Sequence, residues 1–153
     1  KKTIAALSLD PKLWESAMVF QIKRMGYNEH RWLDSGDVPN VQFLASVCEI
    51  ARQTPNVMHW LPTREVKTLL AFIKQYGADH IPSNLNIRVS APMVNDKPLS
   101  AFDNVPQITT STVHDKHNAP QGHSCPARNQ GNACGDCRAC WSSDVANVSY
   151  PIH

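Results

Sequence analysis

Four cysteines near the end of this 153-residue sequence are the residues best suited to chemistry. They are Cys125, Cys134, Cys137 and Cys140, spaced C-x8-C-x2-C-x2-C. A reducing cytosol disfavours disulfides, and clustered thiols there are more often metal ligands or redox groups. Four thiolates held together without a cation would repel one another and oxidise. The spacing therefore predicts a metal centre rather than paired disulfides or a free thiol cluster.

The spacing of the cysteines indicates which kind of metal centre they bind. Zinc sites usually present two separate C-x2-4-C pairs, whereas bacterial-type ferredoxins use a C-x2-C-x2-C run and a remote Cys-Pro around a [4Fe–4S] cluster. Here Cys134, Cys137 and Cys140 form the run, and Cys125 precedes Pro126, although this Cys-Pro lies before the run instead of after it. The pattern favours a [4Fe–4S] cluster with a structural or electron-transfer role, and Zn²⁺ is the alternative.

Other possible ligands lie close by in the sequence. His114, His117 and His123 precede the cysteines and are each able to replace one thiolate, although a solvated loop position is more typical of such residues. Cys48 falls on the apolar face of an expected helix, which indicates a buried core thiol. The expected metal ligands are therefore the four C-terminal cysteines.

The segment that carries these cysteines has little apolar surface. From His114 the sequence is rich in Gly, Asn, Asp and Pro, with no helical or strand periodicity until "NVSYPIH". Ordering a residue costs roughly 1–2 kcal/mol of backbone entropy, which metal binding can offset. We expect an α/β domain over residues 1–117, and a Cys-rich metal-binding segment over residues 118–153 packed on it.

The first two thirds of the chain alternate between strand and helix patterns. Asp10 and Pro11 begin a helix with apolar residues up to Gly26, and "NEHRWLDSGD" and "NVMHWLPTRE" are strands that each lead into an amphipathic helix. "NLNIRVSAP" and "VPQITTSTVH" are two further strands, separated by a loop over Met93 to Pro106. Such βα repeats predict an α/β fold with a small parallel, partial-barrel-like sheet.

A second candidate site lies where the expected strands end. Ligands bind beyond the carboxyl ends of parallel strands, and these positions carry Asp34, Ser35, Asp37 and Arg64. Such a polar rim is suited to binding a small molecule or a phosphate. The structural alternative is that Asp37 caps a helix and Asp34 pairs with Arg64. The sequence has no Walker loop, G-x-G-x-x-G, H-E-x-x-H or G-x-S-x-G motif.

Charge and hydropathy narrow the classes of function. The formal charge is +2, so electrostatics does not indicate nucleic acid. Arg128, Arg138 and Lys116 support a nucleic-acid contact only in the alternative of a zinc-stabilised interaction module. No apolar run approaches the roughly 20 residues of a membrane span, and no signal peptide opens the sequence. We expect a cytoplasmic protein, in the host cell cytoplasm if it is phage-encoded.

Three stretches carry a resemblance to a known family. "HRWLDSGD", "HWLPTRE" and "CPARNQGNACGDCRACWSSDVANVSYPIH" resemble the bacteriophage proteins named after gene product 88. The resemblance covers most of the chain and implies no established activity. Members commonly carry an upstream cysteine-rich segment that ends near Cys-Tyr, and this sequence has none before Lys1. We therefore expect the chain to be the downstream part of a longer product.

A more distant resemblance is to radical S-adenosylmethionine proteins, which hold an iron–sulfur cluster at one end of a partial barrel of βα repeats. It implies an enzyme acting on a small molecule near Asp34, Asp37 and Arg64. Those enzymes use a C-x3-C-x2-C run that leaves one iron for the cofactor, and this sequence lacks that run. A cluster whose four irons are each bound by a cysteine instead favours a structural or electron-transfer role.

Overall fold

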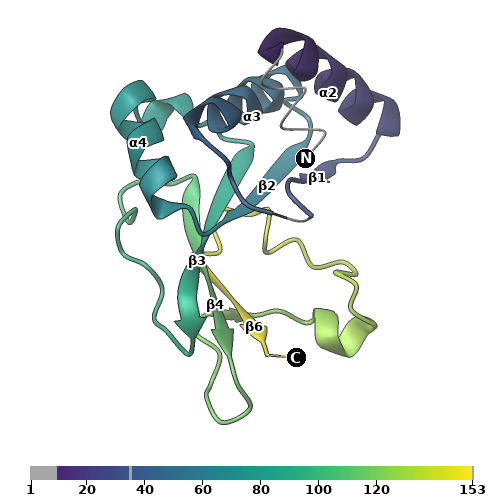
Figure 1. Ribbon diagram of the computed structural model, residues 1–153. Helices are drawn as coiled ribbons and strands as arrows, with labels where there is room; N and C mark the ends of the chain where they lie inside the picture. The colour runs from purple at the N-terminus through teal and green to yellow at the C-terminus, as the bar shows by residue number, and fades with distance from the viewer. Residues whose placement is uncertain (1–9, 35, 153) are drawn as a thin grey trace.

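The chain folds around one six-stranded sheet in which every pair of neighbouring strands is parallel (Figure 1). The computed structural model describes residues 10–34 and 36–152. The strand order is β1-β2-β3-β4-β6-β5. The strands are β1 (Glu29–Arg31), β2 (Met58–Thr63), β3 (Leu85–Val94), β4 (Ile108–His114), β5 (His123–Ser124) and β6 (Asn147–Pro151). The α/β fold with a parallel, curled sheet is confirmed.

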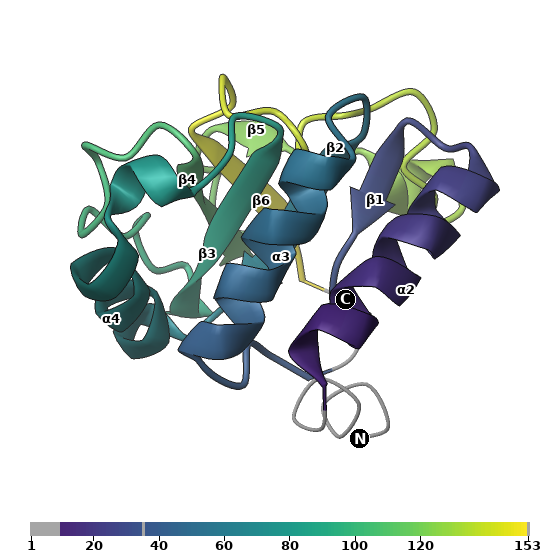
Figure 2. The same cartoon turned by 90° about the horizontal axis from the view of Figure 1, so that it is seen from above.

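Within the described part of the chain, three α-helices cover one face of the sheet (Figure 2). They are α2 (Pro11–Met25), α3 (Val41–Gln53) and α4 (Val66–Tyr76), and two 3₁₀ turns are η1 (Ala78–His80) and η2 (Ala127–Gln130). Asp10 caps α2 by accepting a hydrogen bond from the Leu13 amide at 3.0 Å, as expected of an Asp-Pro start. Gly26 ends the helix in the left-handed conformation, which glycine adopts without strain.

Alternation along the strands gives the sheet two different faces. Leu61, Ile87 and Val89 point toward the helices and are fully buried in the main hydrophobic core. Their neighbours point to the opposite side, which we call the tail face because the C-terminal segment covers it. The tail face carries Trp60, Asn86, Arg88, Val148 and Tyr150. One face is thus an apolar core, and the other combines polar, charged and aromatic groups.

The sequence pattern predicts Met25 on the apolar face of α2 and Leu70 on that of α4, and the structure corrects both expectations. Met25 at the end of α2 is 61% exposed, and the helix contacts the core through Trp14, Val19 and Ile22 instead. In α4, Leu70 is exposed and Phe72 is fully buried. A single helix packed on a sheet buries only a narrow stripe, so apolar residues at its margins remain in water.

The C-terminal segment contributes to the sheet as well as covering it. β6 pairs with β4, and the two-residue β5 pairs with β6 at the sheet edge. A separate Cys-rich unit beginning at residue 118 stays a prediction, although two of its stretches are strands of the common sheet. Among the helices of residues 10–34 and 36–152, none combines the length and apolar character that a bilayer crossing requires.

Candidate functional site

Two polar side chains of β3 fasten the cysteine segment to the tail face. Arg88 donates through Nη2 to the carbonyl oxygens of Ala139 at 2.9 Å, Ser142 at 3.2 Å and Val145 at 3.1 Å. Asn86 donates through Nδ2 to the carbonyl of Cys140 at 2.8 Å. Backbone carbonyls of a segment without regular structure need such partners when they are buried.

Tight turns bring the C-x2-C-x2-C run around on itself. The Cys137 amide donates to the carbonyl of Cys134 at 3.0 Å, and the Trp141 amide donates to the carbonyl of Arg138 at the same distance. Gly135 lies inside the first turn with φ of 55°, where a side chain would be strained. Glycine is therefore required by the turn that separates the first two cysteines of the run.

Three of the four cysteines belong to one small hydrophobic cluster on the tail face. Cys140 is buried with Trp60 and Val148, and the partly buried Cys125 and Cys137 pack against them. Cys134 is exposed. The segment thus places Cys125, Cys137 and Cys140 together and leaves Cys134 at the surface.

Two polar contacts reach the sulfurs. The Tyr150 hydroxyl lies 3.1 Å from Cys140 Sγ, and His123 Nε2 lies 3.5 Å from Cys137 Sγ. His123 is therefore the histidine nearest to acting as an additional ligand. His114 instead pairs with Ser149 Oγ at 2.7 Å.

The electrostatics of the cluster involve both signs of charge. Burial raises the pKa of the Cys140 thiol, and the nearby Cys125 and Cys134 raise it further. The hydrogen bond from Tyr150 and the positive charge of Arg88 lower this pKa and so partly oppose the effect of burial. Arg88 is itself fully buried, and this burial lowers the pKa of its guanidinium, against the opposing influence of Tyr150 and Cys140. An arginine remains protonated in proteins, so a positive charge lies beneath the cysteines.

Two buried hydrogen-bond donors on the tail face have no acceptor within the described residues. They are Trp60 Nε1 and Arg88 Nε. Arg88 also forms no ion pair with any carboxylate in the described part of the chain. A buried charge normally has a counter-charge, and a buried unsatisfied donor in a native protein requires an explanation such as a bound ion. The chemistry of this face fits a group that is anionic and accepts hydrogen bonds.

The ligand side chains are not gathered around one point. Within residues 10–34 and 36–152, no three His, Cys, Asp or Glu side chains lie close enough together to hold a single metal ion. The assignment of Cys125, Cys134, Cys137 and Cys140 as metal ligands stays a prediction.

Comparison with protein families identifies the chain. The family model described as Gene product 88 matches residues 2–143, which include helices α2 to α4, strands β1 to β5 and all four cysteines of the C-terminal segment, whereas β6 follows the matched range. The chain belongs to the Gene product 88 family. Comparisons with curated proteins and with solved structures each gave no match. This Gene product 88 protein is therefore placed by family, while its site must be interpreted from its own residues.

The four polar candidates at the strand ends do not form one group. Asp37 accepts hydrogen bonds from Thr63 Oγ1 at 2.6 Å and from the Arg64 amide at 2.8 Å, joining the loops after β1 and β2. Asp34 is exposed and forms no ion pair with Arg64 in the described residues, and Ser35 lies outside those residues. The cap of α3 is Asn40, not Asp37. A role for these residues in ligand binding stays a prediction.

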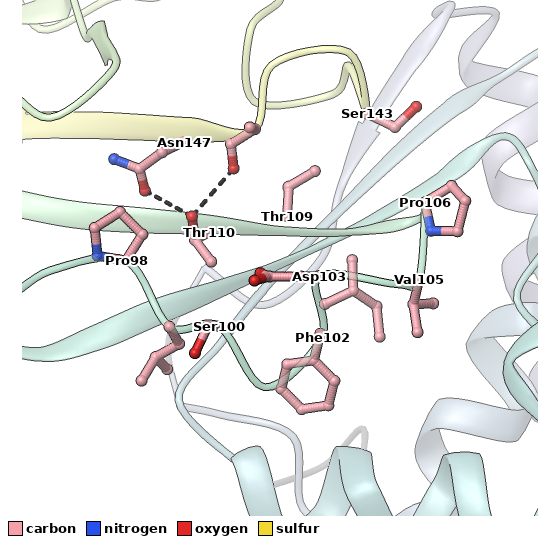
Figure 3. A pocket seen from close by; sticks show the side chains of 13 residues that line it. Pro98, Ser100, Phe102, Asp103, Val105, Pro106, Thr109, Thr110, Ser143 and Asn147 are labelled. Carbon is pink, nitrogen blue, oxygen red and sulfur yellow. Dashed lines mark hydrogen bonds between the residues drawn. The ribbon is translucent and has the colours of Figure 1, made fainter.

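A cavity of about 460 Å³ lies at the other end of the sheet, beside the first residues of β4 and β6 (Figure 3). Thr110 and Asn147 on its wall satisfy each other, because Thr110 Oγ1 donates to Asn147 Oδ1 at 2.8 Å. Asp103 is its one ionisable lining group. Ligands of parallel sheets bind at the carboxyl ends, so the position of this cavity does not favour it as the main site.

Sequence reasoning missed the two residues that organise the tail face. Arg88 and Asn86 were visible only as polar members of the alternating stretch "NLNIRVS". That alternation indicates a strand with one polar face, and a buried arginine on such a face is a signal for a docked segment or an anionic centre. Their partners in the cysteine segment could not be identified from sequence because they are backbone carbonyls more than fifty residues away.

Proposed function

We propose that this protein binds a [4Fe–4S] cluster through Cys125, Cys134, Cys137 and Cys140, in a structural or electron-transfer role. The observation that carries the proposal is Arg88, which is fully buried next to the cysteine segment without a carboxylate partner in the described residues. A centre with four thiolate ligands is anionic and supplies the counter-charge that a buried guanidinium needs.

The unsatisfied donors support the same proposal. Iron–sulfur centres are stabilised and tuned by hydrogen bonds to their sulfurs, and Trp60 Nε1 and Arg88 Nε are N–H donors without acceptors in the described residues. Tyr150 is a third donor, already in contact with Cys140 Sγ. The chain therefore offers donors on the face against which its cysteines pack.

Iron–sulfur binding is favoured over zinc by the spacing of the cysteines, because Cys137 belongs to both C-x2-C pairs and two separate pairs are not present in the run. Zn–S bonds of about 2.3 Å place the four sulfurs of a tetrahedral site only about 4 Å apart. A cube has one iron for each thiolate, so its ligand sulfurs lie further apart, as suits a segment that bends through successive turns.

The alternative of a radical S-adenosylmethionine-type enzyme rests on the curled parallel sheet alone. Fold does not establish activity, and the C-x3-C-x2-C run is not present in this sequence. Full ligation by four cysteines would leave no iron for a cofactor, so the proposal is limited to structural or electron-transfer duty. A reducing cytoplasm, that of the host cell for a phage-encoded chain, suits free thiols and such a cluster.

Single cysteine-to-alanine variants test the ligand assignment. Iron content and visible absorbance of anaerobically prepared protein should fall strongly in C125A, C134A, C137A and C140A. The matched control is C48A, because Cys48 is a buried core thiol whose pKa is raised to about 12 by burial. Circular dichroism would show that the sheet is intact. Iron retained equally in all five variants would contradict the proposal.

A further inference from the structure

Two adjoining cavities lie beside the carboxyl ends of β4, β5 and β6. One has a volume of about 330 Å³ and is lined by Cys125, Arg128 and Tyr150, among others. The other has a volume of about 350 Å³ and is lined by His114, Lys116 and Arg128, among others. Arg128 and Pro151 line both. We call the two together the β4–β6 groove, and each part is within the usual size of a small-molecule site.

Positive charge predominates in this groove. Arg128 and Lys116 are both exposed, and neither forms an ion pair with another described residue. Arg128 donates one hydrogen bond, from Nη1 to the carbonyl of Ile152 at 3.1 Å. A guanidinium has five N–H donors in a planar fork, so the remaining ones can bind a carboxylate or a phosphate.

The acidic residue of the groove is already engaged. Asp115 accepts hydrogen bonds from Asn95 Nδ2, from Asn118 Nδ2 and from the His117 amide, each at 2.9 Å. These donors lower the pKa of Asp115 to about 2. Its carboxylate is therefore used to order the loop after β4 and does not pair with Arg128 or Lys116.

We propose that the β4–β6 groove binds a small molecule carrying a phosphate or carboxylate group, with Arg128 as the main anchor and Lys116 as a second cation. The groove lies at the carboxyl ends of parallel strands, where such folds bind ligands. The bound anion lies within reach of Cys125 and Tyr150, which line the same groove. The proximity of this anion site to an iron–sulfur cluster rests on the proposed function. Binding of the anion in the groove does not depend on that function.

Neither another exposed arginine nor another cavity combines a basic side chain without an ion-pair partner with a position at the carboxyl ends of the strands. Arg138 pairs with Glu29 at 2.8 Å and lies over the Trp141 ring, so its charge is compensated. The cavity at the amino ends of β4 and β6 is lined by no lysine or arginine. The β4–β6 groove is thus distinguished by two basic residues without an ion-pair partner among the described residues, together with its position at the carboxyl ends.

Isothermal titration of the purified chain with inorganic phosphate and, separately, with succinate tests this inference. The two probes distinguish phosphate from carboxylate recognition. We expect one or both to bind, and R128Q to weaken binding about tenfold or more, as for loss of a charge-assisted hydrogen bond. K116Q should weaken it less. R24Q, which removes an exposed arginine of α2, should bind as the natural chain does.

Failure of both probes to bind, or equal affinities for R128Q and R24Q, would overturn the inference. Amide chemical shifts supply a second readout that does not depend on the variants folding. Each bound probe should shift residues of the loop after β4 and leave α2 unchanged, and the reverse pattern would also overturn it. Phosphate or succinate binding by a chain that holds no iron would leave this inference standing while removing the proposed function.

Discussion

Arg88 Nη2 on β3 donates to the carbonyl oxygen of Ala139 at 2.9 Å, across 51 positions of the chain. The same Nη2 donates to the carbonyl oxygens of Ser142 and Val145, and Nη1 donates to the carbonyl oxygen of Thr110. One buried side chain therefore joins the middle of the sheet to the segment that carries three closely spaced cysteines.

Replacing Arg88 by Met should release that segment. The change leaves buried carbonyls without donors, and each such loss costs about 1–3 kcal/mol, so we expect the free energy of unfolding to fall by about 3 kcal/mol or more. Urea unfolding measures this loss, and limited proteolysis should cut between residues 139 and 145. R24M is the matched control and should change stability by less than about 0.5 kcal/mol. Equal stability of the two variants would show that Arg88 does not fasten the segment.

Asp37 should matter to stability more than Asp34 does. Asp37 accepts three hydrogen bonds, from Thr63 Oγ1 and the amides of Arg64 and Val38, whereas Asp34 is exposed. We expect D37A to lower the free energy of unfolding by about 2 kcal/mol and D34A to lower it by less than about 0.5 kcal/mol. Thermal and urea unfolding of both variants provide the comparison. Similar small losses in both would remove the structural role that the contacts assign to Asp37.

His59 makes the fold sensitive to acid. It is fully buried on β2, where Nδ1 accepts from Trp32 Nε1 at 3.2 Å and Nε2 lies 2.8 Å from Thr54 Oγ1. Because the indole can only donate, His59 Nε2 carries the proton in the neutral ring. Burial, and secondarily the nearby His30, lowers the pKa of His59 to about 3.

The sign of the pH effect follows from this lowered pKa. Between pH of about 6.5 and 3 the unfolded chain binds a proton at His59 that the folded chain does not, so stability decreases as pH falls. The loss attributable to His59 should reach about 3 kcal/mol by a pH of about 4.5. Urea unfolding at several pH values should give a shallower dependence of stability on pH for H59Q than for the natural chain. An unchanged slope in H59Q would contradict this origin of the acid sensitivity.

Tyr150 should tune the proposed cluster. Its hydroxyl lies 3.1 Å from Cys140 Sγ and can donate to a thiolate ligand, which stabilises the more negative, reduced state. If the hydrogen bond is stronger by about 1.4 kcal/mol in the reduced state than in the oxidised state, this difference corresponds to about 60 mV for one electron, and Y150F should have a midpoint potential lower by about that amount. Redox potentiometry with Y27F as the exposed control measures the shift. Equal potentials for Y150F and Y27F would rule out this tuning.

The sequence predicted the parts of the fold that depend on local patterns. Alternating strands and amphipathic helices gave the parallel sheet, and the Asp10–Pro11 start and Gly26 end of α2 follow from local chemistry. β5 was not predicted because two residues are too short to show periodicity. The C-x2-C-x2-C run was visible because its residues are close in sequence, whereas its fastening by Arg88 depends on contacts between distant segments.

For the polar residues at the strand ends, too, the sequence predicted the general position but not the individual contacts. Parallel strands place the loops after β1 and β2 together, so a meeting of Asp37 with Thr63 and Arg64 was within reach of sequence reasoning. The identity of the bonded atoms was not, because it depends on local backbone geometry. An expected Asp34–Arg64 ion pair is absent from the described residues, since exposed charges gain little by pairing in water.

The central claim is most directly tested by measuring iron, acid-labile sulfide and zinc per chain in protein purified without oxygen. A [4Fe–4S] cluster predicts a brown protein with about four irons and about four sulfides per chain, and both should be lost in C137S together with protection of the segment from proteases. A colourless protein containing one zinc, or a chain whose C-terminal segment is equally protected without any metal, would contradict the account.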